Sequence, residues 1–213
     1  MRARLLLGLW LLLALSPALA EDPAPDAVVR SVVNEALARV AAEAGALGQD
    51  GELARRIVAT EAMPHVDLEL MSRFLLGPRA RQVDAATLDR FSEALGERLT
   101  RLYAAALQRY AEEIADFASE GQIDLRTVSD DGQRATVAAR LRGPQIRETT
   151  LRLQLYRRDG RWRVFDIEVA GISALLLFRD ALGKRLREEG IEAVIADLAD
   201  GEAGLDDAWK QDR

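Results

Sequence analysis

Three acidic side chains are the best candidates for acid–base chemistry in this chain: Asp116, Asp166 and Glu168. Asp166 and Glu168 are two residues apart, so in a strand they share one face and could act as a carboxylate pair. Charged residues of a strand normally face solvent, however, and this favours structural roles for both. Asp166 has apolar neighbours on each side. We therefore expect it to be partly buried and bonded to the backbone near Gly171.

Other catalytic chemistry has little support in the sequence. The chain has no cysteine and a single histidine, His65. The absence of cysteine excludes thiol catalysis and thiolate metal sites, and one histidine argues against a histidine metal site or a Ser–His–Asp triad. The sequence has no G-x-S-x-G, Gly-rich phosphate loop or H-E-x-x-H motif. We expect His65 to be a surface or capping residue, and no metal or cofactor.

The first residues have the pattern of a secretory signal. Arg2 and Arg4 precede an apolar run, Leu5–Leu15, and Ala18–Ala20 forms an A-x-A cleavage site. The run has about 11 residues, whereas a membrane-spanning helix needs about 20. We expect cleavage after Ala20 and export of the remaining chain.

Composition limits the partners of the remaining chain. The net charge is −6 and becomes about −8 without Arg2 and Arg4, which disfavours nucleic acid and stable adsorption to anionic lipid head groups. A protein of this charge that handles lipid would need a pocket. We expect residues 21–25 to be a flexible lead, 26–199 a single domain, and 200–213 an acidic tail.

Hydrophobic periodicity predicts helices followed by strands. Helical spacing and caps predict helices over 26–45, 52–62, 67–77 and 84–114. Gly96 lies inside the last of these and indicates a bend or a close approach.

The period then changes to two. Alternation predicts strands over 123–128, 135–141, 151–155 and 162–169, with helices over 173–189 and 191–198 closing the chain. Short connections between successive strands imply an antiparallel meander. The expected fold class is α+β: N-terminal helices, a four-stranded curved antiparallel sheet and C-terminal helices.

Apolar surface is abundant in three places: the stripe of the long helix, the strand Leu151–Leu155 and the segment Arg161–Asp180. An ordinary filled core would account for all three. Aromatic residues are only 5% of the chain, so a cavity with such walls would suit flexible acyl chains better than a planar ligand.

Three segments together resemble the MlaC family, periplasmic phospholipid-binding proteins also called the toluene-tolerance family. They are PHVDLELMSRFLLG (Pro64–Gly77), the F-x3-L-x3-L-x3-Y stripe from Phe91 to Tyr103, and WRVFDIEVAGIS (Trp162–Ser173). The last is similar to the family signature W-[KR]-x-[YF]-D-x-x-x-[EA]-G-[VI]-S. One departure is Pro78–Arg81, where members of the family commonly carry an aromatic residue. The resemblance therefore implies no particular contact for this loop.

The resemblance implies a cone related to nuclear transport factors that encloses an apolar cavity. It implies a carrier without chemistry that holds phospholipid tails inside and leaves the head group in solvent. The implied partners are an inner-membrane ABC transporter complex with a periplasmic substrate-binding ring and an outer-membrane lipoprotein–porin complex. Such a carrier would maintain outer-membrane lipid asymmetry, and we expect it to be a monomer.

The expected lipid-binding residues combine the resemblance with the apolar stripes. They are Met71, Phe74, Phe91, Leu95, Leu99, Tyr103, Leu153, Leu155, Phe165, Ile167, Ile172, Leu175 and Leu176. Two alternatives remain open: an isomerase or dehydratase with the same cone, which would use Asp116, Asp166 or Glu168, and a periplasmic interaction scaffold with a filled core.

Overall fold

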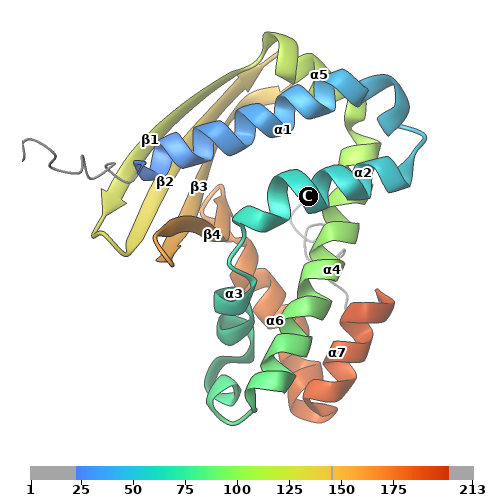
Figure 1. Ribbon diagram of the computed structural model, residues 1–213, viewed down its shortest axis with the longest axis vertical. Helices are drawn as coiled ribbons and strands as arrows, with labels where there is room; N and C mark the ends of the chain where they lie inside the picture. The colour runs from blue at the N-terminus through green and yellow to red at the C-terminus, as the bar shows by residue number, and fades with distance from the viewer. Residues whose placement is uncertain (1–22, 145, 202–213) are drawn as a thin grey trace, which may run out of the picture.

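A meandering sheet and a group of helices beside it make up the described part of the chain (Figure 1). The computed structural model describes residues 23–144 and 146–201. The predicted signal peptide and most of the predicted acidic tail lie outside these residues.

The helices before the sheet begin close to the predicted positions, although two of the predicted helices are divided in the structure. They are α1 (Pro25–Leu47), α2 (Gly51–Ile57), a π-helical turn η1 (Val58–Ala62), the 3-10 helices η2 (Met63–His65) and η3 (Gly77–Arg81), α3 (Leu68–Leu76), α4 (Ala85–Arg109) and α5 (Ala111–Glu120). Side chains cap three of them, because Asp50, Asp67 and Asp84 accept hydrogen bonds from the first-turn amides of α2, α3 and α4. The sequence thus sets the helix starts locally.

The prediction of one long helix over 84–114 is wrong. The helix breaks at Tyr110, whose φ of −110° and ψ of 24° end α4, and α5 begins at Ala111. The break lets α5 turn and pack along α1. The sequence has no proline or glycine at this position. We therefore attribute the break to the packing of α5 against α1.

In the described part of the chain the sheet has five strands in the order β1-β2-β3-β4-β5, all antiparallel, where four were expected. They are β1 (Gln122–Asp130), β2 (Arg134–Gly143), β3 (Ile146–Arg158), β4 (Arg161–Val169) and β5 (Ile172–Ser173). The extra strand arises because Ala170 and Gly171 adopt positive φ values of 52° and 85° and fold the chain back onto β4. Two residues then pair before α6 (Ala174–Glu188) and α7 (Gly190–Asp200) complete the described chain.

Within residues 23–144 and 146–201, buried side chains form three clusters. Helix α1 packs on one face of the sheet, where Val29 meets Val137, Leu155 and Trp162. A second cluster joins the end of α1 to α2, α4 and α5. The largest lies among α3, α4, α6 and α7, which gather below the sheet in Figure 1. The junction between the sheet and this helical group is where a cavity can form.

Candidate functional site

An apolar pocket of about 210 Å³ lies at the junction between β4 and the helical group. Its thirteen lining residues come from the η1–η2 segment, α3, α4, β4 and α6. They are Ala62, Met63, Val66, Met71, Leu99, Tyr103, Val164, Phe165, Asp166, Ile167, Ala174, Leu175 and Phe178. Only two of these side chains, Tyr103 and Asp166, carry a hydrogen-bonding oxygen.

A bulge in β4 places Phe165 in the pocket wall. Gln154 of β3 is opposite Asp166 but the next residue, Leu155, is opposite Val164, so Phe165 is the extra residue in β4. An extra residue bends a strand and re-aims its side chains. Phe165 packs against the cluster of α3, α4 and α6, whereas Val164 packs with the cluster under α1. Neighbouring residues of one strand thereby reach two different cores.

Helix α4 supplies the opposite wall. Leu99 and Tyr103 are four residues apart and therefore lie on one side of the helix. The pKa of the Tyr103 hydroxyl is raised above its ordinary value, mainly by desolvation against the pocket wall and further by the nearby Asp166 carboxylate, although 38% of the residue as a whole is exposed to solvent. The phenol therefore stays neutral, as an apolar site requires.

Asp166 fixes the turn that leads from the sheet into α6. Its Oδ1 accepts hydrogen bonds from the amides of Ile167 at 2.8 Å and Leu175 at 3.0 Å, and Oδ2 accepts one from the Ser173 hydroxyl at 2.6 Å. Ser173 Oγ in turn caps α6 by accepting a bond from the Leu176 amide at 3.0 Å. Both carboxylate oxygens are thus engaged in structure. This confirms the expected bonding of Asp166 near Gly171.

An ion-paired clamp holds the η2–α3 segment against β4. The Asp67 amide donates to the Val164 carbonyl at 2.8 Å, and the Asp67 carboxylate, 2% exposed, binds the Arg158 guanidinium at 3.0 Å. Arg158 also binds Glu69 at 2.8 Å. The clamp fixes the wall that contains Met63 and Val66.

The structure divides the expected lipid-binding residues into three groups. Those that line the pocket are Met71, Leu99, Tyr103, Phe165, Ile167 and Leu175. Those packed in the interior or under α1, away from this pocket, are Phe91, Leu95, Leu153 and Leu155. Those at the surface are Phe74, Ile172 and Leu176, each 39–40% exposed, with the Arg179 guanidinium over the Phe74 ring.

The other lining residues were not predicted to bind lipid, and of these only Asp166 was singled out from the sequence, as a candidate for acid–base chemistry. Ala62 and Ala174 are small and carry little hydrophobic signal, although they border the pocket. Val66 lies inside the family-like segment Pro64–Gly77, and Phe178 follows Leu175 at helical spacing. The sequence could therefore have predicted both as lining residues.

The remaining candidates for chemistry do not gather at the pocket. His65 ends η2, Asp116 lies on α5, and Glu168 accepts a hydrogen bond from Gln154 at 3.1 Å. None of the three lines the pocket. Among the residues that the structure describes, no group of three or more His, Cys, Asp or Glu side chains could hold a metal ion.

Comparison with known proteins assigns the chain to a family. The family model described as MlaC protein matches residues 30–200, most of the chain. The chain belongs to the MlaC family. A relative in Haemophilus influenzae, the intermembrane phospholipid transport system binding protein MlaC, is 24% identical over 183 residues, which cover 83% of this chain and 81% of the relative.

A solved structure confirms the fold. The phospholipid-binding protein of Ralstonia solanacearum, determined in complex with a phospholipid, matches with a TM-score of 0.69 at 15% identity. The match covers 86% of this chain and 99% of that one. No helix within residues 23–144 and 146–201 is both long and apolar enough to cross a membrane.

Proposed function

We propose that this MlaC-family protein is a periplasmic carrier that holds phospholipid tails in the apolar pocket between β4, α4 and α6. The observation that carries the proposal is the pocket lining, whose side chains are hydrocarbon except at Tyr103 and Asp166. Asp166 is occupied by three hydrogen bonds, so the wall offers tails almost no competing polar surface. The family membership supports it, as do the names of the Haemophilus influenzae and Ralstonia solanacearum proteins, which describe phospholipid transport and phospholipid binding.

Energetics explain why such a carrier needs no chemistry. Two acyl chains contain about 30 methylenes, whose exposure to water costs roughly 25 kcal/mol at about 0.8 kcal/mol each. An apolar interior removes that barrier. A bilayer is equally apolar, so transfer between membrane and pocket can be nearly balanced, which lets the carrier both load and unload. We infer that the protein is not an enzyme.

The pocket must widen to take its cargo. Ligand pockets usually span about 300–1,000 Å³, whereas this one measures about 210 Å³. Leu99, Phe165, Leu175 and their neighbours would contact the tails, and the surface residues Phe74, Ile172 and Leu176 would meet lipid only as it enters.

The partners follow from the same assignment. We infer that lipid is exchanged with an inner-membrane ABC transporter complex and an outer-membrane lipoprotein–porin complex, after a signal peptide has directed the chain to the periplasm. The name of the Haemophilus influenzae relative, an intermembrane phospholipid transport protein, supports exchange between two membranes.

Native mass spectrometry with lipid extraction tests the proposal. The purified protein should carry phospholipid and should take it up from liposomes. Ala62→Trp should lower lipid occupancy severalfold, because Ala62 is an exposed residue that lines the pocket and a bulky ring there would fill it. Ala59→Trp is the matched control, since Ala59 is exposed on the same π-helical turn and lies outside the lining.

The outcomes separate the alternatives. No phospholipid on the wild-type protein, together with no uptake, would overturn the carrier proposal. Equal lipid occupancy in Ala62→Trp and Ala59→Trp would place the tails elsewhere in the molecule.

A further inference from the structure

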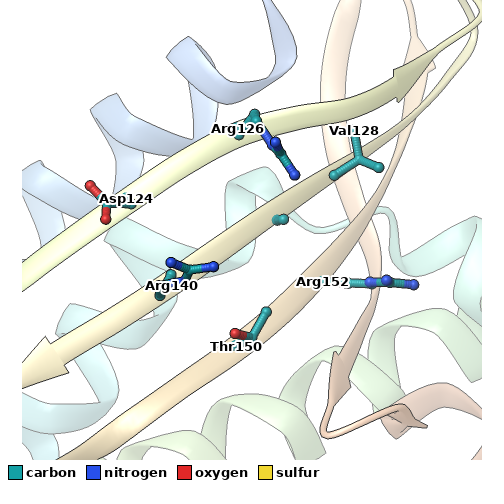
Figure 2. A pocket seen from close by; sticks show the side chains of 7 residues that line it. Asp124, Arg126, Val128, Arg140, Thr150 and Arg152 are labelled. Carbon is teal, nitrogen blue, oxygen red and sulfur yellow. The ribbon is translucent and has the colours of Figure 1, made fainter.

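The sheet face that points away from α1 carries a second hollow, of about 360 Å³ (Figure 2). Inward residues Ala135 and Val137 pack under α1, so by strand alternation Ala138 and Arg140 face outward. The lining residues come from β1, β2 and β3. They are Asp124, Arg126, Val128, Ala138, Arg140, Thr150 and Arg152.

Strand register gathers three arginines around one alanine. Arg126 of β1 and Arg152 of β3 are both Cα partners of Ala138 of β2. Neighbouring strands are about 4.8 Å apart, so the two arginine Cα atoms are roughly 10 Å from each other with the small alanine between them. Arg140 lies one outward position along β2 (Figure 2). We call this group, Arg126, Arg140 and Arg152 around Ala138, the arginine cradle.

Two arginines of the cradle form no ion pair within the described residues. Arg140 binds Glu148 at 3.4 Å, but Arg126 and Arg152 make no ion pair or hydrogen bond with any side chain in the described part of the chain. A guanidinium remains charged at all physiological pH values. In a protein of net charge −6, this local excess of positive charge can recruit an anionic partner.

The surroundings favour a narrow partner over a flat one. Carboxylates border the cradle on several sides: Asp124 is the Cα partner of Arg140, Glu168 is the Cα partner of Arg152, and Asp130 and Asp131 lie at the β1–β2 turn. Glu148 binds Arg140 and Arg142. The pKa of Asp131 is lowered, chiefly by hydrogen bonds from the backbone amides of Arg134 and Gln133, which keeps it ionised. A flat anionic bilayer would meet these carboxylates together with the arginines. An extended peptide, one strand wide, can lie between them.

We propose that the arginine cradle docks an extended acidic segment of a partner protein. Its carboxylates would bind the guanidinium groups of Arg126, Arg140 and Arg152, which suit paired hydrogen bonds to carboxylates. Val128 is 51% exposed at the edge of the hollow and provides an apolar contact for a neighbouring side chain of that segment. The cradle shares no residue with the apolar pocket. A partner can therefore hold the protein here while the pocket stays free to exchange its contents.

A fluorescent peptide of alternating glutamate and valine tests the docking by anisotropy with the purified protein. The wild type should bind it, more weakly as salt rises. Arg126→Glu/Arg152→Glu should weaken binding about tenfold or more, because charge-assisted hydrogen bonds are replaced by repulsion. Arg79→Glu/Arg81→Glu makes the same charge change at two exposed residues of η3 and should alter binding less than about twofold.

A substitution that fills the cradle from within provides an independent test. Ala138→Glu places a carboxylate between its two cross-strand arginine partners. It should abolish peptide binding while the melting temperature stays equal or rises. Ala138→Gln, which has the same shape without the charge, should retain most of the binding.

Several results would overturn the proposal. They are no peptide binding by the wild type, equal binding by Arg126→Glu/Arg152→Glu, or an equal loss in Arg79→Glu/Arg81→Glu. Displacement of the peptide by inorganic phosphate, but not by chloride of equal ionic strength, would make the cradle a simple anion site. Arginine-dependent sedimentation with phosphatidylcholine–phosphatidylglycerol vesicles would assign the face to a membrane. Arg126→Glu/Arg152→Glu should keep its bound phospholipid, so failure here is distinguishable from failure of the carrier proposal.

Discussion

At the scale of single residues, Ser173 connects the sheet to the helical group. Its hydroxyl donates to Asp166 and accepts from the Leu176 amide, and the residue is 9% exposed. One side chain therefore satisfies a carboxylate and a helix terminus together. The Asp166–Ser173 pair aligns β4, β5 and α6, so it sets the position of Leu175 in the pocket wall.

Replacing Ser173 by alanine should lower the free energy of unfolding by about 1–2 kcal/mol, because the α6 cap and one hydrogen bond to Asp166 are lost. Urea unfolding followed by circular dichroism measures the change. Ser31→Ala is the control, since Ser31 is exposed and bonds only Glu35; it should change the value by less than about 0.5 kcal/mol. Similar effects of the two substitutions would show that the Ser173 bonds add little stability.

Tyr103 gives the protein a dependence on alkaline pH. The pKa of its phenol is raised above 10.0 in the folded state. The contribution of Tyr103 to the free energy of unfolding is therefore fully present below pH 10.0 and is lost as the pH rises through the folded pKa. Tyr103→Phe should remove that loss, whereas Tyr110→Phe should keep it. Urea unfolding at neutral and strongly alkaline pH measures both variants. If the free energy of unfolding of Tyr103→Phe falls with alkaline pH as steeply as that of the wild type, the titration belongs to other groups.

At the scale of elements, Gly96 allows α3 to approach α4 closely. A Cβ on Gly96 would lie 2.7 Å from Leu68 Cδ1, the end of a flexible side chain, so a larger residue here would force Leu68 to shift. The sequence indicated a bend or a close approach at this position, and the structure shows the close approach.

A double-mutant cycle tests the contact between the two helices. In the Leu68→Ala background, Gly96→Ala should stabilise the protein by up to about 1 kcal/mol through helix propensity. In the wild-type background the clash with Leu68 should cancel that gain. Chemical unfolding of the four variants gives the coupling energy, and equal effects of Gly96→Ala in both backgrounds would contradict the contact.

The same elements show what the sequence could and could not predict. Helix starts at Asp67, Asp84 and Ser173 were correct because each depends on a hydrogen bond a few residues away. The break at Tyr110 was missed because it depends on packing against α1, remote in the sequence.

The pocket lining was harder to predict than the fold. The apolar stripe of α4 continues from Phe91 and Leu95 to Leu99 and Tyr103, but only the last two reach the pocket. Phe91 and Leu95 are fully buried among other helices. A stripe shows which side of a helix is covered, whereas the position of an unfilled space depends on the whole packing arrangement.

At the scale of the whole molecule, the narrow pocket requires movement of at least one wall. The η1–η2 wall contains a π-helical turn, whose hydrogen bonding is unusual and often marks functional sites. The clamp of Asp67 and Arg158 holds the end of this wall to β4, so widening is expected between Val58 and Met63.

Hydrogen exchange with and without bound phospholipid should locate that movement. Amides of residues 58–63 should exchange more slowly in the loaded protein, because tails fill the space behind them. Amides of α7, which contributes no lining residue, serve as the internal reference and should not change. Protection confined to α7 or to the outer strands would contradict a widening at η1.

The edge of β4 has a consequence for the choice of cargo. A strand edge normally presents polar backbone groups, yet at this pocket the Val164 carbonyl is bonded by the Asp67 amide and the Ile167 amide by the Asp166 carboxylate. These groups have nothing left to offer a guest molecule. Discrimination among lipids should then rest on the length and shape of their chains and not on hydrogen bonds to this strand.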